Sequence, residues 1–598
     1  MKRIFKTLLW CCIVLFTMPA AGQDNQSGTL PETFHILPVP RSVEVLPGDG
    51  LYFDALDHVV LGELTERPVM GSLLSQLPFG EGAGKGALIL EIVGEQNTSL
   101  PASPEGYQLI IRDQQVRVRS RDQAGLFYGC QTLQQLLEES RDHGVPVPDC
   151  KIVDYPELTY RAVQIDVKHH LDHMKTYYDA VDRLARYKIN AIVFEFEDKL
   201  GYRRQPLVAA PHAISIKEMA ALTDYARERN IEITPLVQGL GHASFILKHE
   251  QYAHLREQED NRWAFCPLHE GTYQVLFDLY RDAIEATPGS RYLHVGGDEI
   301  GSIGLCPRCK PTADEEGTLA LNVYWLNRVS EFALRHGRIP IFWDDMPLKE
   351  AGVYRTAHHV MPMEEVDSLW QEGAQKLSSV LGDFPDTCVF MRWNYSLGTQ
   401  PGNIRALEYY QENDLGVMIA TAAQSGPASL FPFDERHGGV SARGVPAIKS
   451  FVELAAEKGI DGMLCTAWDD RSLHMETMWR GYIASAQYSW NPGSLTLDEY
   501  DKAYLRKDYG TAISDYGSLY LWLRDATMYW EGVFNRTNDR LHISNALLPL
   551  PGIGHELTPE ESRRLRSKQV DYTQKLIELP DLQNPGAWTS KYADRLEE

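Results

Sequence analysis

The chain has 598 residues, which is too long for a single hydrophobic core, so it is expected to fold as several units. Asp and Glu (82) outnumber Lys and Arg (58), and the formal net charge is −24 at pH 7. Nucleic acid is therefore excluded as an expected partner, because binding to phosphates needs a basic face.

The first segment has the pattern of a secretory signal peptide. Three basic residues precede an apolar run over residues 8–16, and small residues follow up to Gly22. The run is too short to cross about 30 Å of hydrocarbon, so we predict a cleaved signal peptide at residues 1–22. The mature chain is then expected to be exported, to the periplasm or outside the cell, without a membrane span.

Residues 30–157 predict a small α/β domain. Segments 87–93 and 107–120 have the composition of strands, and residues 124–140 carry apolar side chains at helical spacing. Prolines mark the end of this domain.

Eight short apolar segments follow over residues 158–492, separated by amphipathic helical stretches that several glycines end. This alternation predicts a (β/α)8 TIM barrel rather than an open doubly wound sheet, because no glycine-rich phosphate loop follows the first strand. The predicted strands are 163–167, 191–197, 232–238, 292–297, 339–345, 388–394, 416–422 and 462–468. Residues 493–598 predict a helical C-terminal region that packs on the barrel.

Acids and aromatic residues gather where these strands end, which is the end of a barrel that carries chemistry. Trp and carboxylate side chains suit a sugar, because a pyranose has an apolar face and hydroxyl edges. The residues at the strand ends are Glu195, Glu197, Asp198, His242, His294, Asp298, Glu299, Trp343, Asp344, Asp345, Trp393, Asn394, Tyr395, Trp468, Asp469 and Asp470.

Asp298 and Glu299 are adjacent in the chain. Neighbouring side chains point in different directions, so these two acids cannot flank a glycosidic bond as an ordinary acid and nucleophile. We expect them to have separate tasks.

The stretch His294-Val-Gly-Gly-Asp298-Glu299 resembles the H-x-G-G-D-E hallmark of glycoside hydrolase family 20, the β-N-acetylhexosaminidases. The resemblance extends over residues 33–490, and other stretches are similar to the branch that contains hexosaminidase D. It implies an exo-acting, retaining hydrolase of terminal β-linked N-acetylhexosamine, GlcNAc or GalNAc, with a slight preference for GalNAc. In this family the 2-acetamido group of the substrate is the nucleophile.

The resemblance implies that Glu299 is the general acid and then the base, and that Asp298 orients the acetamido group. Burial beside the negative Asp298 would raise the pKa of Glu299, as a general acid needs near neutrality. Substrate-binding roles are implied for Arg161, His242, Trp343, Tyr395, Trp468 and Asp470. Arg161 opens its strand, about 16 Å along an extended chain from the end that carries chemistry, so its role depends on the resemblance alone.

Two positions depart from the family pattern: Gln238 stands where an acid is usual, and Tyr202 where a tryptophan is usual. The network behind His242 and Glu197 is therefore expected to be rebuilt.

Two other functions fit parts of the sequence. The cluster His169, His170, Asp172 and His173 after the first strand could bind a metal in a barrel hydrolase, although further histidines would be needed at other strand ends. A catalytically silent carbohydrate-binding barrel would keep the tryptophans, but it would not need the acid pair.

Seven cysteines follow the signal segment, too few for a disulfide scaffold. Cys306 and Cys309 form a CxxC motif, which is half of a zinc site or a short disulfide loop. No second pair is visible to complete four ligands, so no cofactor or metal is expected. The oligomeric state is not predicted by the sequence.

Overall fold

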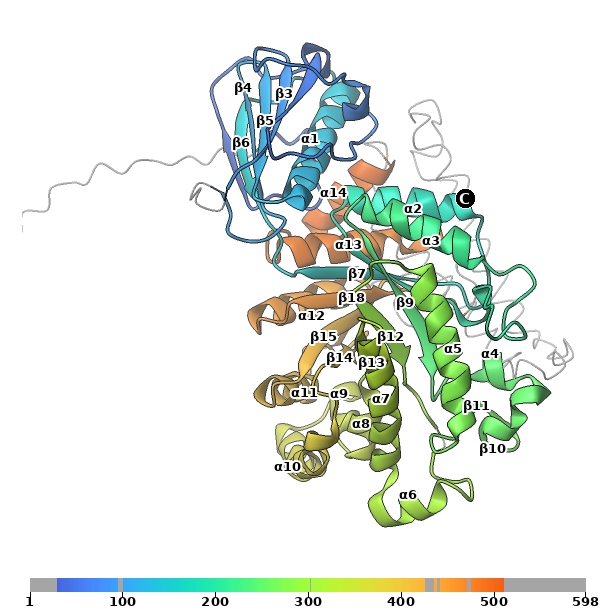
Figure 1. Cartoon of the computed structure of the whole chain (residues 1–598). Coiled ribbons are helices and arrows are strands. Elements are labelled where there is room, and N and C mark those ends of the chain that lie inside the picture. Colours follow the sequence, from blue (N-terminus) through green and yellow to red (C-terminus); the bar gives the residue numbers. More distant parts are fainter. Residues whose placement is uncertain are drawn as a thin grey trace, which may run out of the picture.

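The computed structural model describes residues 30–94, 100–301, 303–424, 435–437, 441–470 and 475–509. Within these residues a small α/β domain lies at one side of a larger barrel (Figure 1). The predicted signal peptide and most of the predicted C-terminal region lie outside the described residues. In the described part of the chain, no helix has the length and apolar character needed to cross a membrane.

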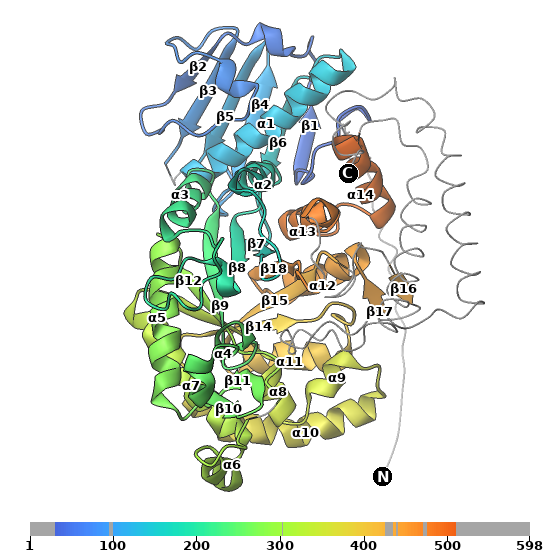
Figure 2. The same cartoon turned by 90° about the vertical axis from the view of Figure 1, so that its right-hand side faces the viewer.

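The N-terminal domain is a mixed six-stranded sheet in the order β1-β6-β4-β5-β3-β2. One helix, α1 (Gln123–His143), lies across this sheet and packs against α2 of the barrel (Figure 2). The carboxylate of Asp122 accepts a hydrogen bond from the Gly125 N–H and begins the helix, and Gly144 ends it with a positive φ of 66°. The strands are β1 (Ser42–Val45), β2 (His58–Leu61), β3 (Ala87–Ile92), β4 (Tyr107–Arg112), β5 (Gln115–Ser120) and β6 (Cys150–Asp154).

Eight parallel strands form a closed barrel, and this confirms the predicted (β/α)8 TIM barrel. Every predicted strand segment contributes one of its strands. In chain order these are β7 (Tyr160–Asp166), β8 (Ala191–Glu195), β9 (Glu232–Gly239), β12 (Tyr292–Gly296), β13 (Ile339–Trp343), β14 (Val389–Trp393), β15 (Gly416–Ala422) and β18 (Gly462–Thr466).

Helices surround the barrel, and two short hairpins, β10–β11 and β16–β17, extend from it (Figures 1 and 2). The helices are α2 (Met174–Arg186), α3 (Ile216–Arg227), α4 (Ser244–Leu247), α5 (Glu270–Ala286), α6 (Lys310–Glu316), α7 (Thr318–Arg335), α8 (Asp345–Glu350), α9 (Tyr354–His358), α10 (Met363–Ser379), α11 (Pro401–Glu412), α12 (Val445–Glu457), α13 (Trp479–Trp490) and α14 (Leu497–Tyr509). The hairpin strands are β10 (Arg256–Gln258), β11 (Asn261–Phe265), β16 (Glu435–His437) and β17 (Ser441–Arg443).

The barrel interior is filled by side chains and has its own apolar cluster, separate from the core between strands and helices. Trp343 and Met391 are its largest fully buried members towards the carboxyl end, and Tyr160 packs edge-on against Tyr292 at the amino end, with ring centroids 5.2 Å apart. The amino end is therefore closed by aromatic rings, which leaves the carboxyl end for a ligand.

Buried ion pairs join the two domains at the amino end of the barrel. The ammonium of Lys188 lies 2.8 Å from the carboxylate of Asp154, and both side chains are fully buried. The indole N–H of Trp490 donates to the other oxygen of Asp154 at 2.8 Å. This contact fixes β6 of the small domain against α13 of the barrel.

Candidate active site

The turn after β12 requires its two glycines. Gly296 and Gly297 have φ values of 69° and 92°, where other residues are strained. A Cβ on Gly296 would lie 2.0 Å from Oε1 of Gln238, and one on Gly297 would lie 2.8 Å from the ring of Trp325. The two glycines therefore allow the chain to turn in close contact with Gln238 and Trp325, just before the two acids.

The two adjacent acids differ in exposure. The side chain of Asp298 is 10% exposed, whereas that of Glu299 is 53% exposed. The burial of Glu299 that we expected is therefore not supplied by the described residues. Asp298 is nearly buried and Glu299 is half-exposed, so the pair can carry out two separate tasks.

His242, after β9, lies between the two acids. Its Nε2 is 3.3 Å from Asp298 Oδ2 and 3.5 Å from Glu299 Oε2. Burial lowers the pKa of His242, but the two carboxylates outweigh burial and hold its pKa well above the usual value. Burial raises the pKa of Asp298, but the positive His242 outweighs it and holds that pKa below the usual value. The site therefore contains an ionised Asp298 next to an imidazolium.

Backbone hydrogen bonds fix Glu299 in a left-handed conformation with φ of 49°. Its N–H donates to Asp345 Oδ2 at 3.0 Å, and its carbonyl accepts from the indole N–H of Trp263 at 2.9 Å. Burial raises the pKa of Asp345 to about 6, although the nearby ammonium of Lys349 opposes this. Asp345 and Trp263 thus position the residue that is expected to transfer the proton.

Aromatic side chains form one wall beside the acids. The ring of Trp343 lies 5.7 Å from that of Trp468 and 4.4 Å from that of His294, measured between centroids. The Trp468 indole N–H donates to the hydroxyl of Tyr395 at 3.0 Å. Burial raises the pKa of Tyr395 well above its usual value, and the charges of Asp298 and Glu299 add to this. Tyr395 therefore remains neutral and faces the acid pair.

Lys168 is a site residue that sequence reasoning missed. Its ammonium pairs with Asp166 and lies 3.0 Å from Asp470 Oδ1 and 5.0 Å from the centroid of the Trp468 ring. Its position predicts a site residue, because Lys168 directly follows the predicted first strand (163–167) and precedes His169. The lysine orients Asp470, whose side chain is 21% exposed and free to accept a ligand hydroxyl on its other oxygen.

The position of Arg161 contradicts the expectation that it binds substrate. Arg161 lies near the amino end of β7, fully buried, and its guanidinium donates to the carbonyls of Lys188 and Leu158 at 3.0 and 2.8 Å. It also pairs with Glu105 of the small domain at 2.7 Å. The start of β7 lies at the opposite end of the barrel from the acids, so Arg161 serves in an ion pair between the two domains.

The two departures from the family pattern lie behind the acids. Gln238 donates to the carboxylate of Glu195 at 3.0 Å, and Gln164 donates to its other oxygen at 2.7 Å. Burial raises the pKa of Glu195 well above its usual value. Tyr202 is buried, and its hydroxyl has no hydrogen-bond partner among the described residues. The amide of Gln238 thus bonds to Glu195 at the position where the family usually has an acid.

Glu197, after β8, also has a shifted pKa at the carboxyl end of the barrel. Burial raises the pKa of Glu197 to about 7, against the attraction of Lys168 and His242. Its φ is 40°, so the chain turns away from the direction of β8 two residues after the strand ends at Glu195.

The histidine cluster after β7 is occupied by hydrogen bonds to one acid. Asp469 Oδ2 accepts from the backbone N–H groups of His169 and His170, and Nδ1 of His170 lies 2.8 Å from Asp469 Oδ1. His242 lies instead with Asp298 and Glu299. Among the described residues, the donor groups that converge closely enough for a metal do not include this cluster.

A barrel with paired acids under tryptophan rings at its carboxyl end is typical of enzymes that hydrolyse glycosidic bonds. Comparison with known families agrees: the model "Glycosyl hydrolase family 20, domain 2" matches residues 33–155, and "Glycosyl hydrolase family 20, catalytic domain" matches residues 158–382. Together these matches cover more than half of the chain, which belongs to glycosyl hydrolase family 20.

Curated relatives are distant in sequence. A β-hexosaminidase of Porphyromonas gingivalis is 24% identical over 395 residues, which cover 58% of this chain and 50% of that protein. Hexosaminidase D of Bos taurus is 29% identical over 190 residues, or 31% of this chain and 55% of the relative. The chain thus spans about half the length of the curated relatives it matches.

Solved structures share the fold. A β-N-acetylhexosaminidase from Bacteroides fragilis has a TM-score of 0.59 at 20% identity, with 79% of this chain and 95% of that chain covered. A Streptomyces plicatus N-acetyl-β-hexosaminidase, solved with thio-NAglucal, has a TM-score of 0.58 at 20% identity, with 79% and 94% covered. The combination of barrel and preceding domain is therefore shared with solved members of the family.

Proposed function

We propose that this chain is an exo-acting, retaining β-N-acetylhexosaminidase that removes terminal β-linked GlcNAc or GalNAc with the help of the 2-acetamido group. The observation that carries the proposal is the unequal acid pair: a buried, ionised Asp298 beside an accessible Glu299. An ordinary retaining enzyme places its two carboxyl groups about 5–5.5 Å apart on opposite sides of the bond, which adjacent residues cannot do.

Each group has a step in this reaction. Glu299 protonates the leaving oxygen as the acetamido oxygen attacks the anomeric carbon, and later takes a proton from the water that opens the ring formed by the acetamido group. The negative charge of Asp298 stabilises the positive charge that develops on the acetamido group. Such stabilisation is strong because Asp298 is buried and already oriented by His242.

The remaining contacts fit a single sugar residue. Trp468, with the buried Trp343 packed against it, offers apolar surface to the acetamido methyl and the pyranose face, and Tyr395 offers its hydroxyl to the acetamido carbonyl. Asp470 accepts a sugar hydroxyl while Lys168 holds its other side. The relative rates on the GlcNAc and GalNAc glycosides measure whether the site prefers an equatorial or an axial hydroxyl at C4.

The test compares aryl glycosides that have good leaving groups with a disaccharide that has a poor one. Wild type is expected to hydrolyse p-nitrophenyl β-GlcNAc or β-GalNAc and to leave the β-glucoside, which lacks the acetamido group. Glu299→Gln should lose about 10²–10⁴-fold on the disaccharide and less on the aryl glycoside, because nitrophenolate leaves without a proton. Asp298→Asn should be impaired on both substrates.

Glu364→Gln is the matched control, since Glu364 is an exposed acid on α10. Its rates should equal those of wild type. Hydrolysis of the β-glucoside at a similar rate, or equal losses for Glu299→Gln on both leaving groups, would contradict the proposed mechanism.

We also propose that the enzyme acts outside the cytoplasm after cleavage of residues 1–22. The support is the basic, apolar and small-residue pattern of that segment. N-terminal sequencing of the mature protein from its native host should begin at Gln23. An intact Met1 on the active protein would contradict this.

A further inference from the structure

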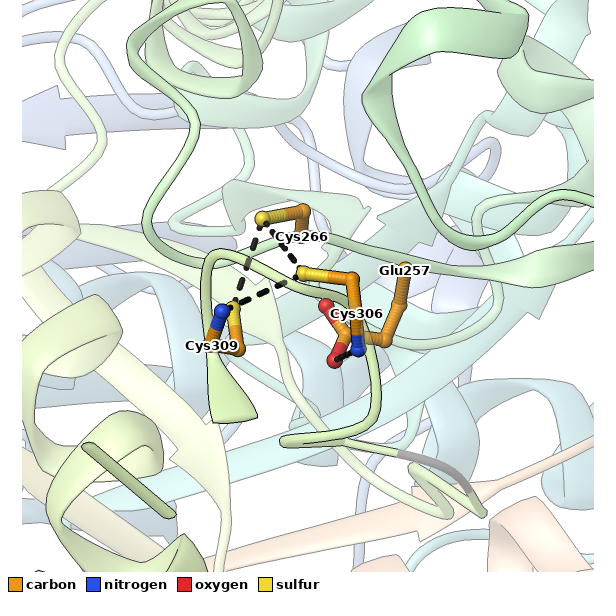
Figure 3. Close-up of side chains that lie close together, drawn as sticks. All are labelled: Glu257, Cys266, Cys306 and Cys309. Atoms are coloured by element: carbon orange, nitrogen blue, oxygen red, sulfur yellow. Dashed lines mark hydrogen bonds between the residues drawn. The ribbon is translucent and has the colours of Figure 1, made fainter. Parts of the chain in front are cut away.

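Three cysteines and one glutamate converge beside the segment that carries the acid pair (Figure 3). Cys266 follows β11, Cys306 and Cys309 precede α6, and Glu257 lies on β10. The Sγ atom of Cys266 is 3.5 Å from that of Cys306 and 3.4 Å from that of Cys309. One ligand atom from each of the four residues lies within 4.8 Å of all the others. The CxxC motif therefore acquires the further donors that the sequence did not reveal.

These sulfur separations fit shared coordination better than a disulfide bond. An S–S bond is about 2.05 Å long, whereas two thiolates about 2.3 Å from one tetrahedral zinc ion lie about 3.8 Å apart. Cys266 and Cys309 are buried, at 2% and 0% exposure, and so is Glu257 at 2%. Buried thiols and a carboxylate brought this close together need a cation between them once they are ionised.

The carboxylate of Glu257 has one oxygen in use and one without a partner. Its Oε1 accepts from the backbone N–H groups of Leu305 and Cys306 at 2.7 and 3.1 Å. Its Oε2 is buried and has no hydrogen-bond partner among the described residues. An unpaired buried carboxylate oxygen is costly, and a metal ion would satisfy it.

Neighbouring groups support thiolate ligands. The backbone N–H of Cys309 donates to Sγ of Cys306 at 3.3 Å, which orients that sulfur. Arg308 Nη1 lies 3.9 Å from Sγ of Cys266 and offsets part of the negative charge.

We propose that Cys266, Cys306, Cys309 and Glu257 bind one zinc ion as a closed, four-ligand structural site. On binding, each of the three thiols releases a proton to solvent and forms a Zn–S bond, and Glu257 Oε2 provides the fourth bond. No position is left for substrate or a reactive water, so the ion takes no part in the hydrolysis.

The four ligands connect two segments of the chain that lie beside the acid pair. Its ligands tie the β10–β11 hairpin to the segment between β12 and α6, which contains Asp298 and Glu299. Between them, Trp263 of the hairpin donates to the Glu299 carbonyl and lies with its ring 4.2 Å from that of His242. Loss of zinc is therefore expected to loosen Glu299 without removing any group that touches substrate.

The experiment measures zinc content by mass spectrometry of the full-length protein, purified without chelators after growth with added zinc. About one zinc per chain is expected for wild type. Cys309→Ser and Cys266→Ser should retain less than about a tenth of that amount, because a site with three ligands binds the ion far more weakly. Cys388→Ser, at a buried cysteine before β14, is the matched control and should retain the full amount.

A second measurement covers the case in which the serine variants do not fold. Wild-type protein stripped of metal under reducing conditions and titrated with Co²⁺ should develop the charge-transfer absorption of thiolate–cobalt bonds at one equivalent, and zinc should abolish it. Glu257→Gln should weaken this titration without removing the band. Zinc should also restore the melting temperature that is lost on stripping.

Two results would overturn the proposal. One is wild-type protein without zinc that is 2 Da lighter than its reduced form because two of these three cysteines are joined by a disulfide bond. The other is full zinc content in Cys266→Ser and Cys309→Ser, which would place the ion elsewhere, such as at His242 with the two acids.

Discussion

The two ends of the barrel use the same residue types for opposite purposes. At the amino end, Lys188 and Asp154 neutralise each other in full burial, and Arg161 is held by carbonyls and Glu105. At the carboxyl end, buried polar atoms have no hydrogen-bond partner among the described residues; they include Asp298 Oδ1, Asp345 Oδ1, His294 Nε2 and Trp343 Nε1. Paired charges hold the domains together at one end, whereas the other end keeps buried polar groups without partners beside the acid pair.

The largest expected effect is at the amino end. Lys188→Met leaves Asp154 buried without its cation and should reduce the free energy of unfolding by about 3–5 kcal/mol. The folded fraction should keep the kcat of wild type, because the change lies away from the acids. Urea unfolding and kcat per folded molecule check this. Asp154→Asn in the same chain should recover part of the stability, and a large fall in kcat at full folding would contradict the division between the two ends.

The next effect is at His242. His242→Gln removes the cation that holds the pKa of Asp298 low, so that pKa should rise. The acid limb of the kcat/KM profile should therefore move to higher pH, and the maximum should fall about 100-fold, or ~2.7 kcal/mol. A profile of kcat/KM against pH is the measurement. An acid limb at the wild-type position would show that His242 does not control Asp298.

Glu197 should give a smaller effect that depends on pH. A carboxyl whose folded pKa is raised to about 7 resists ionisation, so the native state loses stability as pH rises from the unfolded pKa, about 4.5, to about 7. Glu197→Gln removes this loss, so its stability relative to wild type should rise by about 2 kcal/mol between pH 5 and pH 8. Urea midpoints at the two pH values test this, and a constant difference would contradict it.

The smallest effect separates Asp470 from Arg161. Asp470→Asn should raise KM about tenfold, or ~1.4 kcal/mol, because an amide is a weaker acceptor for a sugar hydroxyl. Arg161→Lys should lower the melting temperature and leave KM within about twofold of wild type. Steady-state kinetics of folded protein decide the matter, and a tenfold KM increase for Arg161→Lys would restore its role in the site.

The sequence was sufficient for the barrel because each strand is a short apolar run between amphipathic helices, a local pattern. It also located the acids, since every barrel strand delivers its last residues to the same end. It misplaced Arg161 because the family resemblance overruled the position of that residue at the start of a strand. Lys168 and the partners of Asp469 depend on which strands close the barrel, since β18 meets β7 across about 300 residues of chain.

The difference between Asp298 and Glu299 was also beyond the sequence. Both are acids at one strand end, and their exposures are set by backbone angles after two glycines and by His242, which comes from another loop. The cysteine cluster required a hairpin that brings Cys266 beside a motif 40 residues later. Such long-range proximity follows from the packed fold alone.

Glu197, His242 and Glu299 follow three different strands, and all have positive φ values of 40°, 49° and 49°. A non-glycine residue in this conformation costs about 1–3 kcal/mol of folding free energy, so these three loops lower the stability of the folded protein. Replacing any of them by glycine would relieve the backbone and remove a side chain from the site. Substitutions that raise the thermal stability of this protein are therefore expected in its helices and domain contact rather than in these three loops.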